Sequence, residues 1–306
     1  MRYTKQQQNQ IDQLNLNGLP SREIASQLGL SKSGVNDFLK RNSCPGLTQK
    51  SRIGNKGSKI LVIPDVQAKQ GHSFTYLNRL GHYIVEKKPD KIICLGDFAD
   101  MPSLSSYDAG KKSFEGRRYV LDIEASKSAM TSLLEPLWTY NATAEQQYNP
   151  KMVLLYGNHE NRINRVINDD PKLDGVLSLD DLCYEEFGWQ TVPFLDVHVE
   201  DGVAFSHYFV TGLAGRPAAT ASAQLNKKHM SCIAGHQQGL QIATAYRADG
   251  QQITSLIAGS FYEHSEDYMS AQGNKHWRGV IMLHGVGDGA FDLMPVSINY
   301  LNEKYS

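Results

Sequence analysis

The fold of this chain is decided by one stretch, KMVLLYGNHE at residues 151–160. Its apolar part, residues 152–156, is typical of a buried strand in a mostly parallel sheet. The strand stops at Gly157, and an amide, an imidazole and a carboxylate follow at once. Ligands bind at the carboxyl ends of strands in open α/β sheets, so the same stretch predicts a chemical site. For this stretch alone, a polar turn without function is the alternative.

Two further apolar runs end in the same way. Residues 60–63 lead to Asp65, and residues 91–95 lead to Gly96 and Asp97. Helical patterns at 73–87 and 121–140 lie between these strands, and this alternation predicts a layered α/β fold with right-handed crossovers. Beyond residue 160 we predict helical stretches at 161–187 and 216–230 and short strands at 190–192, 197–199, 203–209, 232–234, 240–246, 252–257, 279–284 and 290–296. The glycine-rich residues 285–289 lie between two strands, which predicts a hairpin turn and not a phosphate loop.

The composition is that of an ordinary globular protein. Of the 306 residues, 41% are hydrophobic and 21% are charged, and no run approaches the ~18 apolar residues of a membrane span. Residues 1–13 are polar, unlike a secretion signal. The four cysteines form no C-x-x-C pair, which favours reduced thiols over a zinc knuckle. We therefore predict no membrane association and a cytoplasmic location.

The net charge of −1 conceals an asymmetry between the two ends of the chain. Residues 1–59 contain ten Lys or Arg against three Asp or Glu, whereas the remainder contains 21 against 29. We call residues 1–59 the head and the remainder the body. A basic head on an acidic body suggests that the head binds a polyanion. A solvated basic tail is the alternative.

The head has the pattern of three short helices. Residues 6–16 form the first, Ser21 is a candidate N-cap for the second, and Gly29 begins a tight turn before a third helix at 32–41. This arrangement resembles a helix-turn-helix DNA-binding module of the resolvase or transposase type. A trihelical packing unit without a nucleic-acid role uses the same apolar spacing.

If the module reads double-stranded DNA, its third helix would make the contacts. Ser33 and Asn36 are candidates for base edges, and Lys32, Lys40 and Arg41 for phosphates. Residues 43–58 have the composition of a basic linker. The predicted organisation is therefore a small all-α domain at 1–42, the linker, and an α/β catalytic domain at 59–306. Such modules often dimerise, so a homodimer is open.

Polar residues recur where strands of the body end. Asp65, Asp97 and Asn158 follow three sheet strands, His207 ends the run at 203–206, and His236 follows the strand at 232–234. Carboxylates, an amide oxygen and imidazoles at one sheet edge form a set of metal ligands. A central carboxylate can bridge two ions about 3.5–4 Å apart, which suits attack on phosphorus.

In their order, these residues resemble a known family. Asp65-x-Gln67, Gly96-Asp97-x-x-Asp100, Gly157-Asn158-His159-Glu160, His207 and Gly235-His236-x-Gln238 are similar to the motifs of calcineurin-like metallophosphoesterases. The resemblance covers residues 60–295 and implies a layered β-sandwich flanked by helices. It further implies that Asp97 bridges two divalent ions, with Asn158, His207 and His236 at one site and Asp65 with residues 67 and 238 at the other. His159 would be the general acid, and Asp100 would orient its ring.

Gln67 and Gln238 depart from the family, which usually has His at both positions. An amide oxygen is a harder, weaker ligand than imidazole, so we expect this site to prefer Mn²⁺ or Mg²⁺, while Zn²⁺ or iron could occupy the Asn158, His207 and His236 site. Three readings follow: a two-metal enzyme with one labile position, one-metal catalysis, or a degenerate site kept for binding.

Other polar residues have simpler expected roles. His72 and His82 are expected on the surface, and His198 competes with His207 for the same role. Arg162 and Arg165 could face a substrate phosphate, although a solvated helix face is the expectation.

Metal ligands give the reaction class and not the substrate. The basic head makes a metal-dependent DNA nuclease, nicking or exonucleolytic, the leading hypothesis, and the chain resembles phage proteins that join these two modules. A phage origin would place it in the bacterial host cytoplasm. The alternatives are a protein or small-molecule phosphatase and a DNA-binding regulator with an inactive body.

Overall fold

The computed structural model describes residues 3–16, 19–42, 57–266, 269 and 272–306. The chain divides into two compact units, Met1–Lys56 and Gly57–Ser306. Residues 43–56 of the predicted linker lie outside the described residues. Within the described ranges, no helix is long and apolar enough to cross a membrane.

The first unit is a bundle of three helices, α1 (Lys5–Leu16), α2 (Ser21–Leu28) and α3 (Lys32–Asn42). Its core consists of Ile11, Ile24, Ala25 and Val35. Gly29 ends α2 in the left-handed region at φ 63°, which glycine adopts without steric cost. Ser21, expected as the N-cap, is instead the first helical residue, and Pro20 stands at the cap. Proline has no N–H that a helix would need, and its φ of −69° leads the chain into α2.

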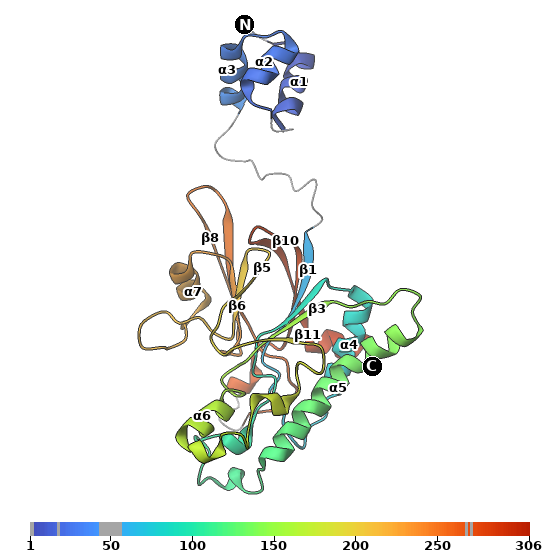
Figure 1. Ribbon diagram of the computed structural model, residues 1–306, viewed down its shortest axis with the longest axis vertical. Coiled ribbons are helices and arrows are strands. Elements are labelled where there is room, and N and C mark those ends of the chain that lie inside the picture. The colour runs from blue at the N-terminus through green and yellow to red at the C-terminus, as the bar shows by residue number, and fades with distance from the viewer. Residues whose placement is uncertain (1–2, 17–18, 43–56, 267–268, 270–271) are drawn as a thin grey trace. The chain divides into compact units, whose positions relative to one another are not determined.

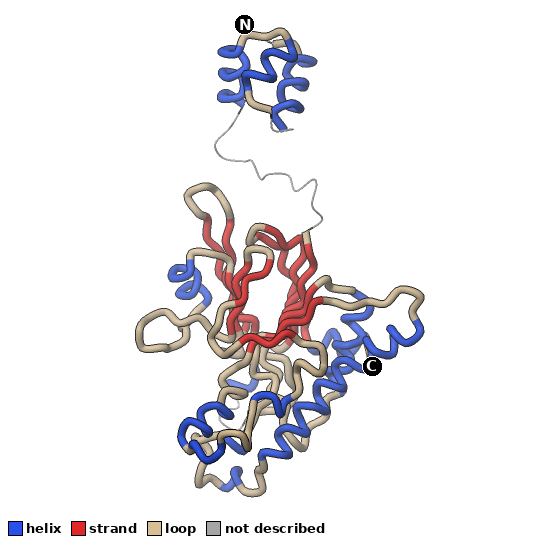
Figure 2. Tube along the Cα trace, in the orientation of Figure 1, coloured by secondary structure: helices blue, strands red, loops and turns tan. Residues whose placement is uncertain are grey.

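The second unit contains two β-sheets that face each other (Figure 2). The six-stranded sheet has the order β11-β10-β1-β2-β3-β4 and the five-stranded sheet β5-β6-β7-β9-β8. The strands are β1 (Ser58–Ile63), β2 (Lys91–Cys94), β3 (Lys151–Leu155), β4 (Gln190–Val192), β5 (His198–Glu200), β6 (Val203–Ser206), β7 (Cys232–Ala234), β8 (Leu240–Tyr246), β9 (Gln252–Ala258), β10 (Gly279–Gly287) and β11 (Ala290–Ser297). Strands β1 to β4 are parallel, whereas β10 and β11 continue the sheet in antiparallel fashion. In the five-stranded sheet β6, β7 and β9 are parallel and the outer strands β5 and β8 are antiparallel to their neighbours, so both sheets are mixed.

Strand β1 shows why helices cover one face of the larger sheet. Leu61 and Ile63 belong to the core shared with the helices, whereas Ile60 and Val62 belong to the core between the sheets. Side chains alternate along a strand, so an apolar run with no polar partner must be buried on both faces. Helices α4 (Thr75–Lys87), α5 (Tyr119–Thr143) and α8 (Ile298–Lys304) cover the outer face (Figure 1). This confirms the predicted α/β fold with two layers of sheet and flanking helices.

Two predicted helical stretches are wrong in length. The stretch expected at 161–187 forms only α6 (Arg162–Asp169), followed by short 3₁₀ turns. Pro171 explains the stop, because proline disfavours helical geometry in the residue before it. The stretch expected at 216–230 forms only α7 (Ala221–Lys228). Thr220 is its N-cap and accepts a hydrogen bond from the Ala223 N–H, so the helix begins after Pro217 and not before it.

The register of the parallel strands brings their carboxyl ends level. Ile63 is paired with Cys94, and Cys94 with Leu154. The loops after β1, β2 and β3 therefore leave the sheet side by side at one edge. Residues 285–287 are the end of β10, and Asp288 and Gly289 turn the chain into β11, so the stretch lies in an antiparallel hairpin, as predicted.

Candidate active site

The loops after β2 and β3 touch through two glycines. A Cβ on Gly157 would lie 2.1 Å from Oδ1 of Asp97, and a Cβ on Gly96 would lie 2.5 Å from the main-chain nitrogen of Gly157. No other residue type allows this approach without displacing the backbone. The two glycines therefore bring Asp97 and Asn158 together.

Glu160 holds the same two loops in place. Its buried carboxylate accepts hydrogen bonds from the main-chain N–H groups of Asp97 (3.0 Å), Ala99 (2.9 Å) and Gly157 (2.9 Å). Three N–H donors satisfy a carboxylate that would otherwise be costly to bury. The sequence pattern gave Glu160 no role, and the structure makes it the support of the site.

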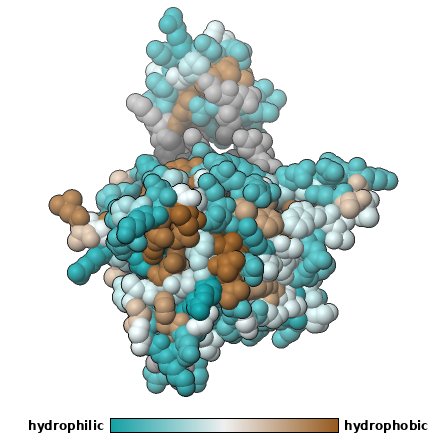
Figure 3. Space-filling model, turned by 60° about the horizontal axis from the view of Figure 1, so that its bottom comes forward, coloured by the Kyte–Doolittle hydropathy of each residue, from teal (hydrophilic) through white to brown (hydrophobic). Residues whose placement is uncertain are grey.

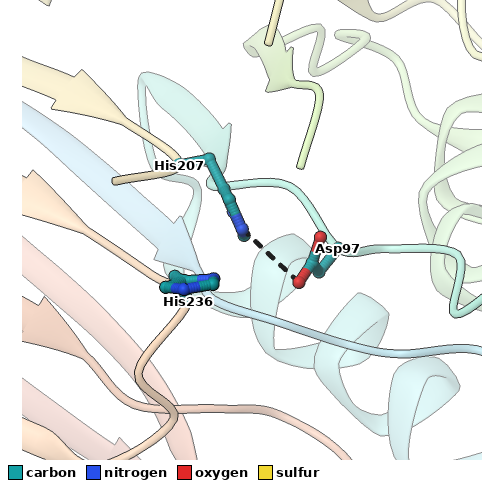
Figure 4. Close-up of side chains that lie close together, drawn as sticks. All are labelled: Asp97, His207 and His236. Carbon is teal, nitrogen blue, oxygen red and sulfur yellow. Dashed lines mark ion pairs between the residues drawn. The ribbon is translucent and has the colours of Figure 1, made fainter. Parts of the chain in front are cut away.

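Asp97, His207 and His236 form a cluster in which one ligand atom of each residue lies within 4.8 Å of the others (Figure 4). Nε2 of His207 lies 3.4 Å from Oδ2 of Asp97. Oδ1 of Asn158 lies 2.8 Å from Nε2 of His207 and 2.8 Å from Nδ1 of His236. The four residues predicted for the first metal site thus converge from four separate loops.

Surrounding groups fix the orientation of the imidazoles. Nδ1 of His207 donates to the main-chain oxygen of Leu95 at 2.9 Å, which leaves Nε2 for the cluster. Such a contact is typical of histidines that bind metals. The ring of Tyr208 lies 4.8 Å from that of His236 and 5.7 Å from that of Phe194. Tyr208 is half-buried, so an aromatic ring borders the cluster at the surface of the unit.

Asp65 and Gln67 carry buried polar atoms without a hydrogen-bond partner among the described residues. These atoms are Oδ2 of Asp65 and both polar atoms of the Gln67 side chain. The other carboxylate oxygen of Asp65 accepts from the main-chain N–H of His236 at 2.9 Å. The Gln67 main-chain N–H donates to Asp97 at 2.7 Å, so both residues adjoin the cluster. A buried polar atom left unpaired costs about 1–3 kcal/mol, and a bound cation would remove that cost.

Gln238 lies two residues after His236, and its amide oxygen accepts a hydrogen bond from the hydroxyl of Tyr262. Tyr262 is fully buried, and the guanidinium of Arg278 lies 4.4 Å from its ring centre. This hydrogen bond fixes the orientation of the Gln238 amide. Tyr262 had no motif that would have identified it in the sequence.

His159 and Asp100 form a dyad beside the cluster. Nδ1 of His159 lies 2.7 Å from Oδ1 of Asp100, and Nε2 lies 3.6 Å from Oδ2 of Asp97. The ring therefore turns its second nitrogen, Nε2, toward the cluster. Lys69 lies 3.8 Å from Oδ2 of Asp100 and pairs with Glu266 at 2.8 Å.

Arg162 and Arg165 do not form the solvated face expected for them. Nη1 of Arg162 donates to the main-chain oxygen of Asp100 at 2.7 Å, and Nη2 lies 3.2 Å from Nε2 of His159. Nη2 of Arg165 donates to the main-chain oxygen of Leu104 at 2.8 Å. Helix α6 follows β3 directly, so its first turns face the loop after β2. The expectation failed because this loop, and not solvent, covers that face.

Several site residues have a strained backbone. Four of them have a positive φ: Gln67 (48°), Asp97 (49°), His236 (69°) and Gln238 (58°). Residues other than glycine rarely adopt this region, and each costs about 1 kcal/mol or more. Backbone strain of this kind persists where neighbouring contacts stabilise the conformation. Here all four strained residues are predicted metal ligands.

The electrostatics are dominated by burial and by Asp97. Burial and the charge of Asp97 raise the pKa of Asp65 to about 7. Burial works against the charged imidazole of His207, but Asp97 outweighs it and raises the pKa of His207 to about 9. Burial and the neighbouring His207 lower the pKa of His236 to about 4. The cluster without an ion thus holds one protonated and one neutral imidazole near pH 7.

The remaining predicted residues lie elsewhere. His198 lies in β5, 3.2 Å from Glu200, and not in the cluster. His72 and His82 are exposed, as expected. Lys32, Ser33 and Asn36 are exposed on α3 of the first unit, whereas the side chains of Lys40 and Arg41 lie outside the described residues.

The donor set fits a divalent cation. Carboxylate, imidazole and amide oxygen suit Mn²⁺, Mg²⁺, Zn²⁺ or iron, and the unpaired oxygens of Asp65 and Gln67 extend the set on one side. Asp97, Asn158, His207 and His236 could hold one ion. Asp65 and Gln67 could hold another, with harder and weaker donors.

Comparison with known proteins gives one family. The family model described as calcineurin-like phosphoesterase matches residues 58–242. Among solved structures, a conserved uncharacterized protein from Streptococcus pneumoniae TIGR4, described as a predicted phosphoesterase, is 9% identical, with 79% of this chain and 90% of that chain covered and a TM-score of 0.30. Yfce, a phosphoesterase from E. coli, is 13% identical, with 79% and 100% covered and a TM-score of 0.29. No curated protein matches.

Proposed function

Since the chain belongs to the calcineurin-like phosphoesterase family, we propose that it is a metal-dependent hydrolase of DNA phosphodiester bonds, targeted by helices α1–α3. The observation that carries the hydrolase part is the convergence of Asp97, Asn158, His207 and His236 beside the His159–Asp100 dyad. Metal ligands and a proton donor side by side are what phosphoester hydrolysis requires.

In this proposal the residues have separate tasks. Asp97, Asn158, His207 and His236 would hold one divalent ion, and Asp65 and Gln67 would hold a second more weakly. Such ions would lower the pKa of water toward neutral pH and would neutralise the phosphate charge. His159 gives a proton to the leaving oxygen through Nε2, because Nδ1 is engaged by Asp100. Asp100 and Glu160 hold the geometry.

Two features support DNA as the substrate. The first unit exposes Lys32, Ser33 and Asn36 on one helix, which suits contacts to phosphates and base edges. In the catalytic unit, Tyr208 presents a half-buried ring beside His236, where an unstacked base next to the scissile phosphate could rest. Tethering the two units raises the local concentration of substrate.

The acidic body favours a second candidate function. Residues 60–306 contain 21 Lys or Arg against 29 Asp or Glu, and such a surface repels DNA away from the site. A phosphatase that acts on proteins or small molecules would not need to bring DNA close to this acidic surface.

Incubation of the full chain with supercoiled plasmid and Mn²⁺ distinguishes a DNA hydrolase from a phosphatase. We expect the full chain to convert the plasmid to open-circle or degraded product, and His159→Ala to abolish this. Lys32→Ala should weaken DNA binding, whereas Lys5→Ala on α1, which removes the same charge from another exposed position, should not. Brisk turnover of p-nitrophenyl phosphate without plasmid cleavage would instead identify a phosphatase.

A further inference from the structure

Arg162 is a largely buried cation beside the proposed proton donor. Its side chain is 12% exposed and belongs to the first residue of α6, two positions after Glu160. Its hydrogen-bond acceptors are the main-chain oxygens of Asp100 and Met101 and the ring of His159, all of them uncharged when that ring is neutral. The nearest oxygen of the Asp100 carboxylate lies 3.7 Å away, beyond hydrogen-bond reach. The guanidinium charge is thus paired only loosely.

The two edges of the guanidinium have different surroundings. Nη1 is anchored to the loop carbonyls at 2.7 and 3.2 Å. Nη2 has two N–H groups and contacts only Nε2 of His159, at 3.2 Å, among the described residues. That nitrogen also lies 3.6 Å from Oδ2 of Asp97, so Nη2 contacts the same ring atom that faces the cluster.

A guanidinium only donates hydrogen bonds, so in this geometry Nε2 of His159 is the acceptor. The ring proton then lies on Nδ1 and is donated to Asp100. In this state Nε2 carries no proton and cannot donate to a leaving oxygen. Once Arg162 releases it, Nε2 must take up a proton from solvent, and only then can His159 act as the general acid. An incoming phosphate offers charged oxygens, which are stronger acceptors than a neutral imidazole.

We propose that Arg162 is a catalytic residue that binds a non-bridging oxygen of the substrate phosphate and exchanges His159 Nε2 for that oxygen when substrate enters. This inference rests on the proposed function only for its phosphoester chemistry, and not for DNA. The proposal identifies a phosphate oxygen of the substrate as the anionic group that binds the loosely paired guanidinium of Arg162. Arg165 lies one turn further along α6, and among the described residues its side chain donates only to the main-chain oxygen of Leu104, so it serves as the matched control.

Calorimetric titration of inorganic phosphate into the full chain with Mg²⁺ tests the proposal. We expect Arg162→Ala to weaken phosphate binding about 10- to 100-fold, the range for a hydrogen bond to a charged group. Arg162→Lys keeps the charge but loses the planar set of guanidinium N–H donors. Its phosphate affinity should lie between those of Arg162→Ala and the parent chain. Arg165→Ala should stay within about twofold of the parent.

Kinetics on p-nitrophenyl phosphate provide the second readout. Arg162→Ala should raise KM and lower kcat, because the phosphate oxygens gain charge in the transition state. Phosphate affinity equal in Arg162→Ala and the parent chain would overturn the proposal, as would an equal loss in Arg165→Ala. Failure to cleave either supercoiled or linearised plasmid, together with Arg162-dependent phosphate binding, would remove DNA as the substrate and leave this assignment standing.

Discussion

The carboxylate of Glu160 accepts the main-chain N–H of Asp97 at 3.0 Å, and this bond ties the loop after β3 to the residue at the centre of the candidate site. Two further N–H groups, from Ala99 and Gly157, point at the same carboxylate. Glu160 is fully buried, so no water replaces these bonds when the side chain changes. The site therefore depends on a residue that touches neither the proposed metal nor the substrate.

Glu160→Gln is the sharpest test of this support. The amide has one oxygen where the carboxylate had two, and its NH₂ group would face main-chain donors. We expect a loss of about 1–3 kcal/mol in the free energy of unfolding, together with weaker Mn²⁺ binding, measured by urea denaturation and by calorimetry. Glu185→Gln is the control, because Glu185 is exposed. Unchanged stability and metal binding in Glu160→Gln would contradict the role.

Gly157→Ala should damage the site without removing a functional group. Its Cβ would lie 2.1 Å from Oδ1 of Asp97, closer than atoms can approach, so the carboxylate or its loop must move. We expect Mn²⁺ affinity to fall at least about tenfold, since ligand geometry sets affinity. Gly212→Ala adds the same methyl group where nothing lies within 4 Å and should leave metal binding unchanged. Equal affinities in the two variants would refute the steric argument.

The layered fold could be predicted because the strands β1, β2 and β3 are continuous apolar runs that only burial on both faces explains. The nine residues predicted for the catalytic site include Asp97, Asn158, His207 and His236, which the structure brings together. They could be named because strand ends and motif spacing are local features of the sequence. Their roles as metal ligands stay predictions.

Other parts of the site depend on contacts between distant segments, which no local pattern encodes. No feature of the sequence distinguishes Glu160 from other polar residues. Its role becomes visible only in the fold, where the loop after β2 donates hydrogen bonds to its carboxylate. Tyr262 reaches Gln238 from another strand end. Arg162 contacts the loop after β2, whereas its sequence position predicts a solvated helix face. The length of α6 was overestimated because apolar spacing continues past the point where Pro171 ends the helix.

The pKa of His207 predicts how metal binding depends on pH. Without an ion, Asp97 outweighs burial and raises this pKa to about 9, so the imidazole is protonated at pH 7.5. A metal ligand must be neutral, so binding releases this proton. His236, with its pKa lowered to about 4, is already neutral and releases none. Affinity should therefore rise with pH up to about 9 and level off above it.

Calorimetry in buffers of different ionisation enthalpy measures this release directly. We expect about one proton per Mn²⁺ from His207 at pH 7.5 to 8, and little release at pH 10, where that residue is already neutral. Binding that is independent of pH between 7 and 9 would mean that His207 is not a ligand.

Gln67→His tests whether the amide weakens the second metal position. The Gln67 side chain is buried, and its two polar atoms have no hydrogen-bond partner among the described residues. Imidazole is a softer and stronger ligand for Zn²⁺ than an amide oxygen, so the variant should hold Zn²⁺ at this position more tightly. We expect the parent chain to retain about one tightly bound ion after dialysis and the variant to approach two, counted by elemental analysis. Gln237→His is the control, since Gln237 follows His236 in the loop after β7 but its side chain donates to the main-chain oxygen of Ala218. Equal zinc content in the two variants would show that residue 67 does not limit the second position.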